Sequence, residues 1–394
     1  RSARIKTFSN DAQTTDSAPS MAAYTTGVKM NNEVIAMSSD TQAVAPAKDI
    51  NGNKGINNCT GDNGTPVPTI LELAKAAGKS VGAVTTTELT HATPAATYSH
   101  ICHRDAAYAI AEQAVPGGAG FNAALGDGVD VLMGGGANHW TPYSASNKGG
   151  RADGRDLTAE LTAQGYSYVT TQSDLAKVSS GKLLGLFSPK SHLDYELDRV
   201  AKGAANTQPS LSEMTAKAID LLSQNSQGYF LMVEGGRIDH ALHGTNAKRS
   251  LTDAVALDEA VKTALGKVDL KDTLIVVTAD HDHTMTINGY SAKGNKVLDL
   301  VKNADGSTQN DVDGKPFTTL VFGNGPNRPA VRPTLTSDEV MADDYLQETG
   351  VKLGSETHGG GDVMLFADGA GSSRFKGTLD NTKVFGKLRE ALGL

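Results

Sequence analysis

Two segments rich in acidic residues and histidine each follow an apolar run, and their side chains are of the types that bind metal ions. In YFLMVEGGRIDHALHG, Glu234 ends the apolar run, and Asp239 and His243 follow with a four-residue spacing. If the segment after the glycines is helical, Asp239 and His243 share one face. An isolated Asp-x-x-x-His is more often a solvated turn. Here, however, the pair follows a predicted strand, where open α/β sheets bind ligands, and this position favours two ligands of a zinc ion, about half of the number that a zinc site needs.

The second segment, TLIVVTADHDH, ends its apolar run with four metal-binding side chains, Asp280, His281, Asp282 and His283. Successive strand residues point to opposite faces, so Asp280 and His281 can share one ion only if the strand has already ended. His283 fits a supporting or a surface position. These acids could alone cap a turn, but together with the first segment they indicate a metal centre. His358, ahead of three glycines that give the backbone room, is a candidate third ligand.

A serine follows an aspartate in TTDSAPSMAAYTTGVK, near the start of the sequence. This order predicts a helix that opens at Ser17, with Asp16 as its cap and Pro19 in its first turn. A helix N-terminus offers free N–H groups and partial positive charge, which suit a phosphoryl oxygen and a serine alkoxide. A plain helix cap is the simpler interpretation of this segment alone. The sequence contains no Gly-x-Ser-x-Gly motif, which argues against an ordinary acyl hydrolase.

Polar side chains also follow the apolar run SVGAV, in the segment ELTHATPAATYSHICHR. Arg104 could bind two phosphate oxygens at once through its planar guanidinium, although any single arginine is more often a surface residue. Thr93 offers an oxygen of the kind that magnesium accepts, and His91 precedes it by two residues. This segment is therefore a candidate phosphate and magnesium site.

The elements that must position these side chains follow from the hydrophobic pattern. Continuous apolar runs predict strands covered on both faces, as in a mostly parallel sheet, at 80–84, 129–133, 229–233, 273–277 and 362–366. Apolar residues spaced three and four apart predict amphipathic helices at 69–77, 210–223 and 250–265. The alternation predicts an α/β/α sandwich with a mostly parallel central sheet. We expect residues 1–394 to form one large domain, with polar surface excursions at 49–64 and 291–314.

Composition narrows the class of protein. The 394 residues include 36 basic and 44 acidic side chains and no long basic run, which argues against a nucleic-acid-binding surface. No apolar stretch approaches the roughly 18 residues of a membrane span, and the first ten residues lack the apolar core of a signal peptide. The two cysteines, Cys59 and Cys102, exclude a thiolate zinc ribbon but leave their pairing open. Any metal must be held by histidines and carboxylates, as in hydrolytic sites.

Taken in order, TTDSAPSMAAYTTGVK, TTELTHATPAA with Arg104, VEGGRIDHALH, TADHDH and ETHGGG resemble the alkaline phosphatases over nearly the whole sequence. The resemblance implies hydrolysis of phosphate monoesters at alkaline pH through a phosphoserine, on a site with two zinc ions and one magnesium ion. Inorganic phosphate would be product and inhibitor. Ser17 would be the nucleophile and Arg104 the phosphate ligand. The implied metal ligands are Asp239, His243 and His358 for one zinc, Asp280, His281 and Ser17 for the other, and Glu234 and Thr93 for magnesium.

Two positions depart from the best-known bacterial members of that family. His91 and His240, which would contact substrate, stand where those enzymes carry Asp and Lys, so the sequence looks more like the animal type. A histidine at position 91 brings no carboxylate charge, which leaves the third metal open between magnesium and zinc. The resemblance also implies a homodimer and a periplasmic or secreted location. We expect the natural protein to extend upstream through an apolar strand ending in Asp-Gly, behind an export signal.

Three other functions use similar residues. A phosphodiesterase or sulfatase of the same superfamily would share the metal ligands, but a guanidinium that binds two free phosphoryl oxygens favours a monoester. A degenerate zinc- or phosphate-binding protein would bind without turnover. A metal-independent mutase is disfavoured by the density of zinc-type ligands. Hydrolysis of phosphate monoesters therefore remains the leading hypothesis.

Overall fold

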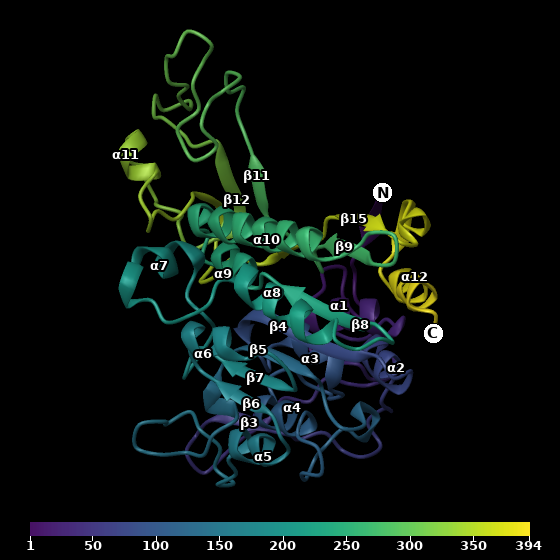
Figure 1. The fold of residues 1–394 in the computed structure, drawn as a ribbon. Helices are drawn as coiled ribbons and strands as arrows, with labels where there is room; N and C mark the ends of the chain where they lie inside the picture. Colours follow the sequence, from purple (N-terminus) through teal and green to yellow (C-terminus); the bar gives the residue numbers. More distant parts are fainter.

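A five-stranded parallel sheet is the largest sheet in the computed structural model, which describes residues 1–394. Its strand order is β6-β7-β5-β4-β8, and every neighbouring pair is parallel. The bounds are Ser80–Glu88 for β4, Val131–Gly135 for β5, Ser167–Val169 for β6, Leu183–Leu186 for β7 and Tyr229–Glu234 for β8. Three of the predicted strands therefore lie in this sheet, and the predicted α/β sandwich is confirmed (Figure 1).

Helices cover both faces of this sheet, as the continuous apolar runs require. Helices α2 (Ile70–Ala76) and α3 (Ala92–Tyr98) pack on one face, and α8 (Leu211–Leu222) packs on the other with α10 (Ala247–Lys267) outside it. Within β4, Val81 and Ala83 join the hydrophobic core on the α2 side, whereas Val84 joins the core on the α8 side. Burial on both faces accounts for an apolar run without alternation.

Local capping fixes where two of the predicted helices begin. Thr69 accepts a hydrogen bond from the backbone N–H of Glu72, and the Glu72 side chain accepts one in return from the Thr69 N–H. Ser210 and Glu213 form the same reciprocal pair at the start of α8. Each pair satisfies two N–H groups that a helix end would otherwise leave without a partner. The predicted helices over 69–77, 210–223 and 250–265 are therefore present, within a few residues.

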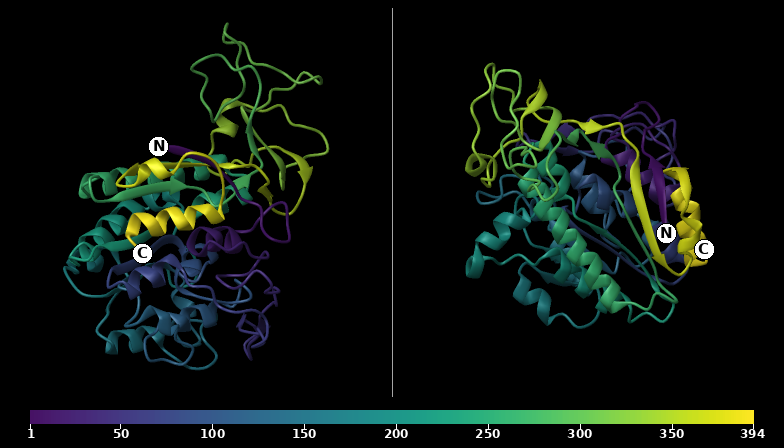
Figure 2. Two further views of the ribbon diagram at one scale, coloured as in Figure 1. Left: turned by 90° about the vertical axis from the view of Figure 1, so that its right-hand side faces the viewer. Right: turned by 90° about the horizontal axis from the view of Figure 1, so that it is seen from above.

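The remaining two predicted strands lie in a second, mixed sheet. Its order is β16-β1-β15-β9, with β1 parallel to β16 and antiparallel to β15, and β15 antiparallel to β9. The bounds are Ser2–Lys6 for β1, Leu274–Thr278 for β9, Val363–Gly369 for β15 and Gly377–Asp380 for β16. The N-terminal strand thus lies between two C-terminal ones (Figure 2).

The burial of this second sheet differs from the sequence expectation. Along β15, Val363 and Leu365 are buried while Met364 and Phe366 are about half exposed, although the run is apolar throughout. Only one face of the sheet is covered, by α1 (Ser17–Thr26) and α12 (Thr382–Leu392), which contribute Tyr24 and Val384 to its core. A mixed sheet needs no helices on both faces, because its strands do not all require crossover connections.

Helix α1 connects the two sheets. Ala18 and Ala22 belong to the core of the parallel sheet, and Tyr24 belongs to the core of the mixed sheet. Met21 packs against both cores. The terminal strands β8 and β9 of the two sheets are only half buried despite their apolar sequences, because each has a strand partner on one side alone. The element that carries Ser17 is therefore held between the strands that carry the other candidate site residues.

The other elements are short and lie mainly around these two sheets. The other helices are α4 (Ala107–Gln113), α5 (Leu157–Ala163), α6 (Gln172–Lys177), α7 (Glu196–Ala201), α9 (Arg237–His243) and α11 (Ser337–Val340). The other strands are β2 (Ala47–Lys48), β3 (Lys54–Ile56), β10 (Asp282–His283), β11 (Met285–Ile287), β12 (Leu320–Gly325), β13 (Thr349–Lys352) and β14 (His358–Gly359). The segment between β11 and β12, which includes 291–314, projects away from the sheets (Figure 1). No helix has the length and hydrophobicity needed to cross a membrane.

A disulfide joins Cys59 to Cys102, which settles a pairing that the sequence left open. Cys59 lies in the mostly exposed excursion 49–64, whereas Cys102 is fully buried two residues before Arg104. The bond closes a loop across 43 residues, for which the chain-entropy relation gives about 4 kcal/mol of stabilisation. The excursion is thus tied to the segment that carries a candidate phosphate ligand.

Candidate active site and metal centre

Ser17 is the first residue of α1, as predicted, and its hydroxyl is buried against a histidine. Asp16 caps the helix by accepting a hydrogen bond from the Ala18 N–H at 2.7 Å. Ser17 is 5% exposed, and its Oγ lies 3.0 Å from Nε2 of His281. The hydroxyl therefore lies at a helix N-terminus, where partial positive charge favours an oxyanion, and beside a nitrogen able to bind a metal ion.

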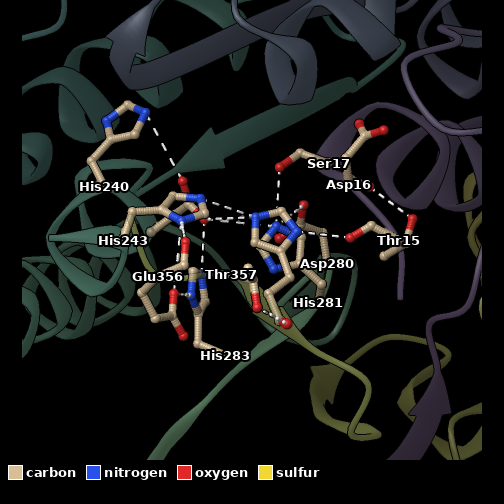
Figure 3. A network of polar contacts seen from close by, with 12 residues as sticks. Thr15, Asp16, Ser17, His240, His243, Asp280, His281, His283, Glu356 and Thr357 are labelled. Atoms are coloured by element: carbon tan, nitrogen blue, oxygen red, sulfur yellow. Dashed lines mark hydrogen bonds and ion pairs between the residues drawn. The ribbon is translucent and has the colours of Figure 1, made fainter. Parts of the chain in front are cut away.

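The carboxylate of Asp239 has four imidazoles close to it. Three of them, His243, His281 and His283, are seen together in Figure 3. Asp239 is on α9, one turn before His243, so the two share a helix face as the four-residue spacing predicts. Its Oδ1 lies 2.8 Å from Nε2 of His283, 3.4 Å from Nε2 of both His243 and His358, and 3.8 Å from Nε2 of His281. Nitrogen and oxygen ligands at these separations can share metal ions.

The charge of Asp239 depends on those neighbours. Burial alone would raise the pKa of its carboxyl, but hydrogen bonds from His283 and His358 outweigh that effect and hold the pKa well below the usual range. The pKa of His283 is shifted in the opposite direction. Burial would lower it, but the hydrogen bonds of His283 to Asp239 and Glu356 raise it to about 9. A fixed carboxylate surrounded by imidazoles is a ligand set for a borderline cation such as zinc.

Glu356 contacts the outer ring nitrogens of two histidines in this cluster. It was not among the residues that the sequence analysis proposed for the site. It is 2% exposed, and its Oε2 lies 2.8 Å from Nδ1 of His283. Its backbone carbonyl lies 2.6 Å from Nδ1 of His243, and its Oε1 accepts hydrogen bonds from the Thr284 N–H and hydroxyl. Contacts of this kind to the outer nitrogen of a ligating histidine fix its ring and tautomer. His283, for which the sequence allowed a surface position, is thus part of the cluster.

His358 joins the cluster from a segment near the C-terminal end of the sequence. The sequence placed it on a loop, but it lies in the two-residue strand β14, which pairs with β10. Its Nδ1 lies 2.7 Å from the carbonyl of Thr15, and its Nε2 lies 3.1 Å from Nε2 of His243. A short strand pair therefore sets the position of His358 between the serine segment and α9.

Asp280 and His281 lie just beyond the end of β9, so the chain has left the strand before either residue. Nε2 of His281 lies 3.3 Å from Oδ2 of Asp280, and the Ser20 hydroxyl donates to that same oxygen at 3.2 Å. Burial lowers the pKa of His281, because it disfavours the charged imidazole. Asp280, His281 and Ser17 are therefore brought together as the family resemblance implied.

Close backbone approach explains two of the glycines in these motifs. A Cβ on Gly236 would lie 2.3 Å from Cγ2 of Thr87, and one on Gly361 would lie 2.3 Å from Oδ2 of Asp282. Both distances are far below van der Waals contact, so a larger residue would displace the neighbouring side chain. The glycines allow α9 and β14 to approach the ends of the strands that carry the candidate ligands.

Glu234 ends β8 in a pocket of threonine hydroxyls. Thr85 donates a hydrogen bond to its Oε2 at 2.5 Å, and Thr87 donates to the same oxygen at 3.3 Å. Burial raises the pKa of Glu234 to about 7, partly offset by the bonds from Thr85 and Thr93. No cationic side chain forms an ion pair with this carboxylate, so a divalent cation would supply its missing positive partner. Oxygen ligands of this kind suit magnesium.

Arg104 is held beside the serine segment by two polar contacts. Its Nη1 lies 3.1 Å from Oδ1 of Asp16, and its Nη2 donates to Nε2 of His91 at 3.1 Å. Nδ1 of His91 is buried without a hydrogen-bond partner. The guanidinium is thus fixed next to the capping residue of Ser17, with its side chain 16% exposed. A fixed guanidinium in this position can bind phosphoryl oxygens in pairs.

Replacing Arg104 by Ala is expected to weaken inhibition by inorganic phosphate by about 1.5 to 3 kcal/mol, because charged hydrogen bonds are lost. Steady-state inhibition kinetics measure this. Arg155→Ala is the matched control, since that guanidinium is 20% exposed and pairs with Glu160 away from the site. An inhibition constant that is unchanged in Arg104→Ala would exclude a phosphate contact.

Some acidic and histidine side chains lie together outside this cluster. Glu33, His103 and Asp105 place one ligand atom each within 4.8 Å of the others. The first of these has a positive φ of 71°, and its backbone N–H donates to Asp16. No local spacing points to this group, because Glu33 lies some 70 residues before the other two.

The chemistry available to these side chains is attack on a phosphoryl group and stabilisation of its charge, which makes this α/β protein a phosphate-ester hydrolase. The alkaline phosphatase family profile matches residues 1–394. The tissue-nonspecific alkaline phosphatase of Gallus gallus is 38% identical over 394 residues, covering 93% of this chain and 71% of that protein. The alkaline phosphatase of Thermus thermophilus superposes with a TM-score of 0.71 and 29% identity, covering 100% of this chain and 83% of that one.

A third similar protein comes from the Antarctic bacterium TAB5. Its alkaline phosphatase has been solved as a variant in which a histidine is replaced by glutamate, with Mg bound in the M3 site. That structure superposes with a TM-score of 0.68 and 25% identity, covering 100% of this chain and 88% of that one. The chain belongs to the alkaline phosphatase family. It is accordingly a phosphomonoesterase, as the sequence motifs implied.

Proposed function

We propose that phosphate monoesters are hydrolysed through a phosphoserine on Ser17. The observation that carries this proposal is the position of its hydroxyl, buried at the N-terminus of α1 and 3.0 Å from Nε2 of His281. Ser17 attacks phosphorus in line with the leaving oxygen, whose bond to phosphorus breaks as the new bond forms, and the partial positive charge of the helix N-terminus faces the charge that develops on the phosphoryl oxygens. Water then releases phosphate from the phosphoserine.

The proposed metal ligands follow the grouping of side chains in the cluster. Asp239, His243 and His358 would hold one zinc, and Asp280, His281 and Ser17 would hold the other. The dense set of imidazoles around a carboxylate whose pKa is held well below its usual range supports this assignment. Zinc bound by these residues would supply positive charge that lowers the pKa of the serine hydroxyl and stabilises the leaving oxygen.

Arg104 and His240 hold the phosphoryl group during the reaction. Arg104 binds equatorial oxygens, and His240, whose Nε2 lies 4.0 Å from Oδ2 of Asp239, donates a hydrogen bond to phosphate or to a water bound by it. His91 fixes Arg104 by accepting from its Nη2. Because these contacts fall on the phosphoryl group rather than on the alcohol, many different monoesters are suitable substrates.

For the third metal we propose that Glu234 and Thr93 hold magnesium and that His91 limits its affinity. His91→Asp is expected to raise the preference for magnesium over zinc, because a hard, charged oxygen replaces a borderline nitrogen. The TAB5 enzyme with Mg in its M3 site after a histidine-to-glutamate change supports this direction. Metal analysis and magnesium titration of activity measure it, with His91→Ala as the control for loss of the imidazole alone. Equal magnesium dependence in wild type and His91→Asp would contradict the assignment.

We also propose a homodimer in a periplasmic or secreted location, with residues 1–394 forming one domain. The disulfide between Cys59 and Cys102 supports an oxidising compartment, where such bonds form and persist. Inorganic phosphate acts as product and inhibitor of the same site.

The choice among ester types is tested by comparing substrates. Turnover of a phosphomonoester is expected to exceed that of a phosphodiester and of a sulfate ester, because only the monoester is a dianion, so its free oxygens present more negative charge to Arg104 than those of the singly charged diester or sulfate. Steady-state kinetics of the zinc- and magnesium-loaded enzyme on matched aryl esters measure this. Faster turnover of the diester or sulfate would favour the related enzymes of the superfamily, and binding without turnover would indicate a degenerate site.

A further inference from the structure

An arginine on the same helix as the proposed zinc ligands contacts the outer edge of His240. Arg237 is the first residue of α9, and His240 follows three residues later, a spacing that places the two side chains on one face. Nη1 of Arg237 lies 2.9 Å from Nδ1 of His240. A guanidinium stays protonated in proteins and can only donate, so Nδ1 of His240 must be the acceptor in this contact.

That contact decides which nitrogen of His240 carries hydrogen. At alkaline pH an imidazole is neutral and has a single N–H. If Nδ1 accepts from Arg237, the hydrogen is on Nε2, and Nε2 is the nitrogen on the side of Asp239, at 4.0 Å from its Oδ2. His240 therefore presents a donor toward the proposed phosphate position, not an acceptor that would repel the phosphoryl oxygens.

Other side chains hold Arg237 and His240 in this arrangement. The guanidinium carbon of Arg237 lies over the ring of Tyr195, 3.7 Å from its centroid, in a cation–π contact. No carboxylate forms an ion pair with Arg237, and its Nε is buried without a partner, so the ring and the imidazole are its main contacts. His192, whose Nδ1 accepts from the Glu88 N–H at 2.9 Å, packs its ring 4.2 Å from that of His240.

We propose that Arg237 is a positioning residue for phosphate binding: it donates to Nδ1 of His240 and thereby keeps the Nε2–H of His240 directed at the phosphoryl site. This inference rests on the proposed phosphate contact of His240. It gives a role to an arginine that touches neither substrate nor metal. The reason is geometric, since a single hydrogen bond at one edge of an imidazole fixes both its tautomer and its ring orientation.

A double-mutant cycle on the metal-loaded enzyme tests this role, with inorganic phosphate as the probe. Arg237→Ala is expected to raise the inhibition constant of phosphate about three- to tenfold, the effect of one lost hydrogen bond. In a His240→Ala background the same substitution should change it less than about twofold, because the group that it positions is gone. An equal change in both backgrounds would show that Arg237 acts only through general stability and would overturn the proposal.

Arg249→Ala is the matched control. Its guanidinium also lies over Tyr195, at 5.6 Å, but pairs with Asp198 and Asp344 and does not contact His240. Phosphate inhibition should be unchanged in this variant. A change as large as that in Arg237→Ala would attribute the effect to the Tyr195 region as a whole and would overturn the proposal.

Nitrogen NMR of the metal-loaded enzyme gives an independent readout that does not depend on whether Arg237→Ala folds. The His240 signals, identified by their absence in His240→Ala, should show a hydrogen-bonded, unprotonated Nδ1 and a protonated Nε2. A protonated Nδ1 would overturn the proposal. If His240→Ala leaves phosphate inhibition unchanged while Nδ1 is unprotonated, the phosphate contact is wrong although the Arg237 bond exists.

Discussion

Ser17→Ala is expected to lower kcat for phosphomonoesters by at least about a thousandfold, the scale of effect seen when a nucleophile is removed. No other hydroxyl is placed in the same way: Ser20, one turn further along α1, donates to Oδ2 of Asp280. Without the serine oxygen the covalent step has no acceptor, and the residual rate reflects charge stabilisation alone. Steady-state kinetics give the rate.

Trapping with labelled phosphate at low pH distinguishes the two serines. The wild-type enzyme and Ser20→Ala should both yield a labelled peptide that contains Ser17, and Ser17→Ala should yield none. Label that persists in Ser17→Ala, with near-normal turnover, would assign the nucleophile to another residue.

Chelation is expected to remove nearly all activity, and zinc together with magnesium should restore it. The proposed ligands are imidazoles and carboxylates, not thiolates, so the bound ions exchange with solution. Loss of the ions also removes the binding free energy that favours the folded state, so the unfolding midpoint should fall along with activity. Metal analysis, activity and thermal unfolding on the same samples measure these changes.

Two outcomes would contradict that prediction. Full activity after long incubation in excess chelator, with metal shown to be absent, would exclude a metal-dependent mechanism. Restoration by magnesium alone would contradict the assignment of zinc to the sites around Asp239 and Asp280.

The sequence predicted the elements of the fold better than their arrangement in sheets. Runs such as 80–84 and 129–133 are apolar throughout because helices cover both faces of their sheet. The run 362–366 has the same appearance, yet Met364 and Phe366 are about half exposed in a mixed sheet. Strand pairing between residues far apart, such as β1 with β15, leaves no local pattern. The pattern therefore located strands but could not assign each to its sheet.

The same distinction holds for the site. Asp239 and His243 were found because both lie on one helical turn after a strand, which is a local spacing. Glu356 was missed because its contact to His283 joins side chains 73 residues apart, and a buried glutamate next to a histidine has no distinctive spacing. His192 likewise reaches His240 only through the folded chain. Local motifs identified residues that carry the chemistry, whereas the residues that support them required the structure.

The position of α1 between the two sheets has a consequence for how the molecule reaches its active form. Ser17 contacts His281 across 264 residues of chain, and His358 contacts Thr15 across 343. Contacts of such long sequence separation are slow to form, because a large loop must close before they contribute any stabilisation. The parallel sheet with α2, α3 and α8 can assemble from more local contacts. The catalytic centre therefore forms only when the mixed sheet docks, which makes enzymatic activity a measure of complete folding and not of any single element.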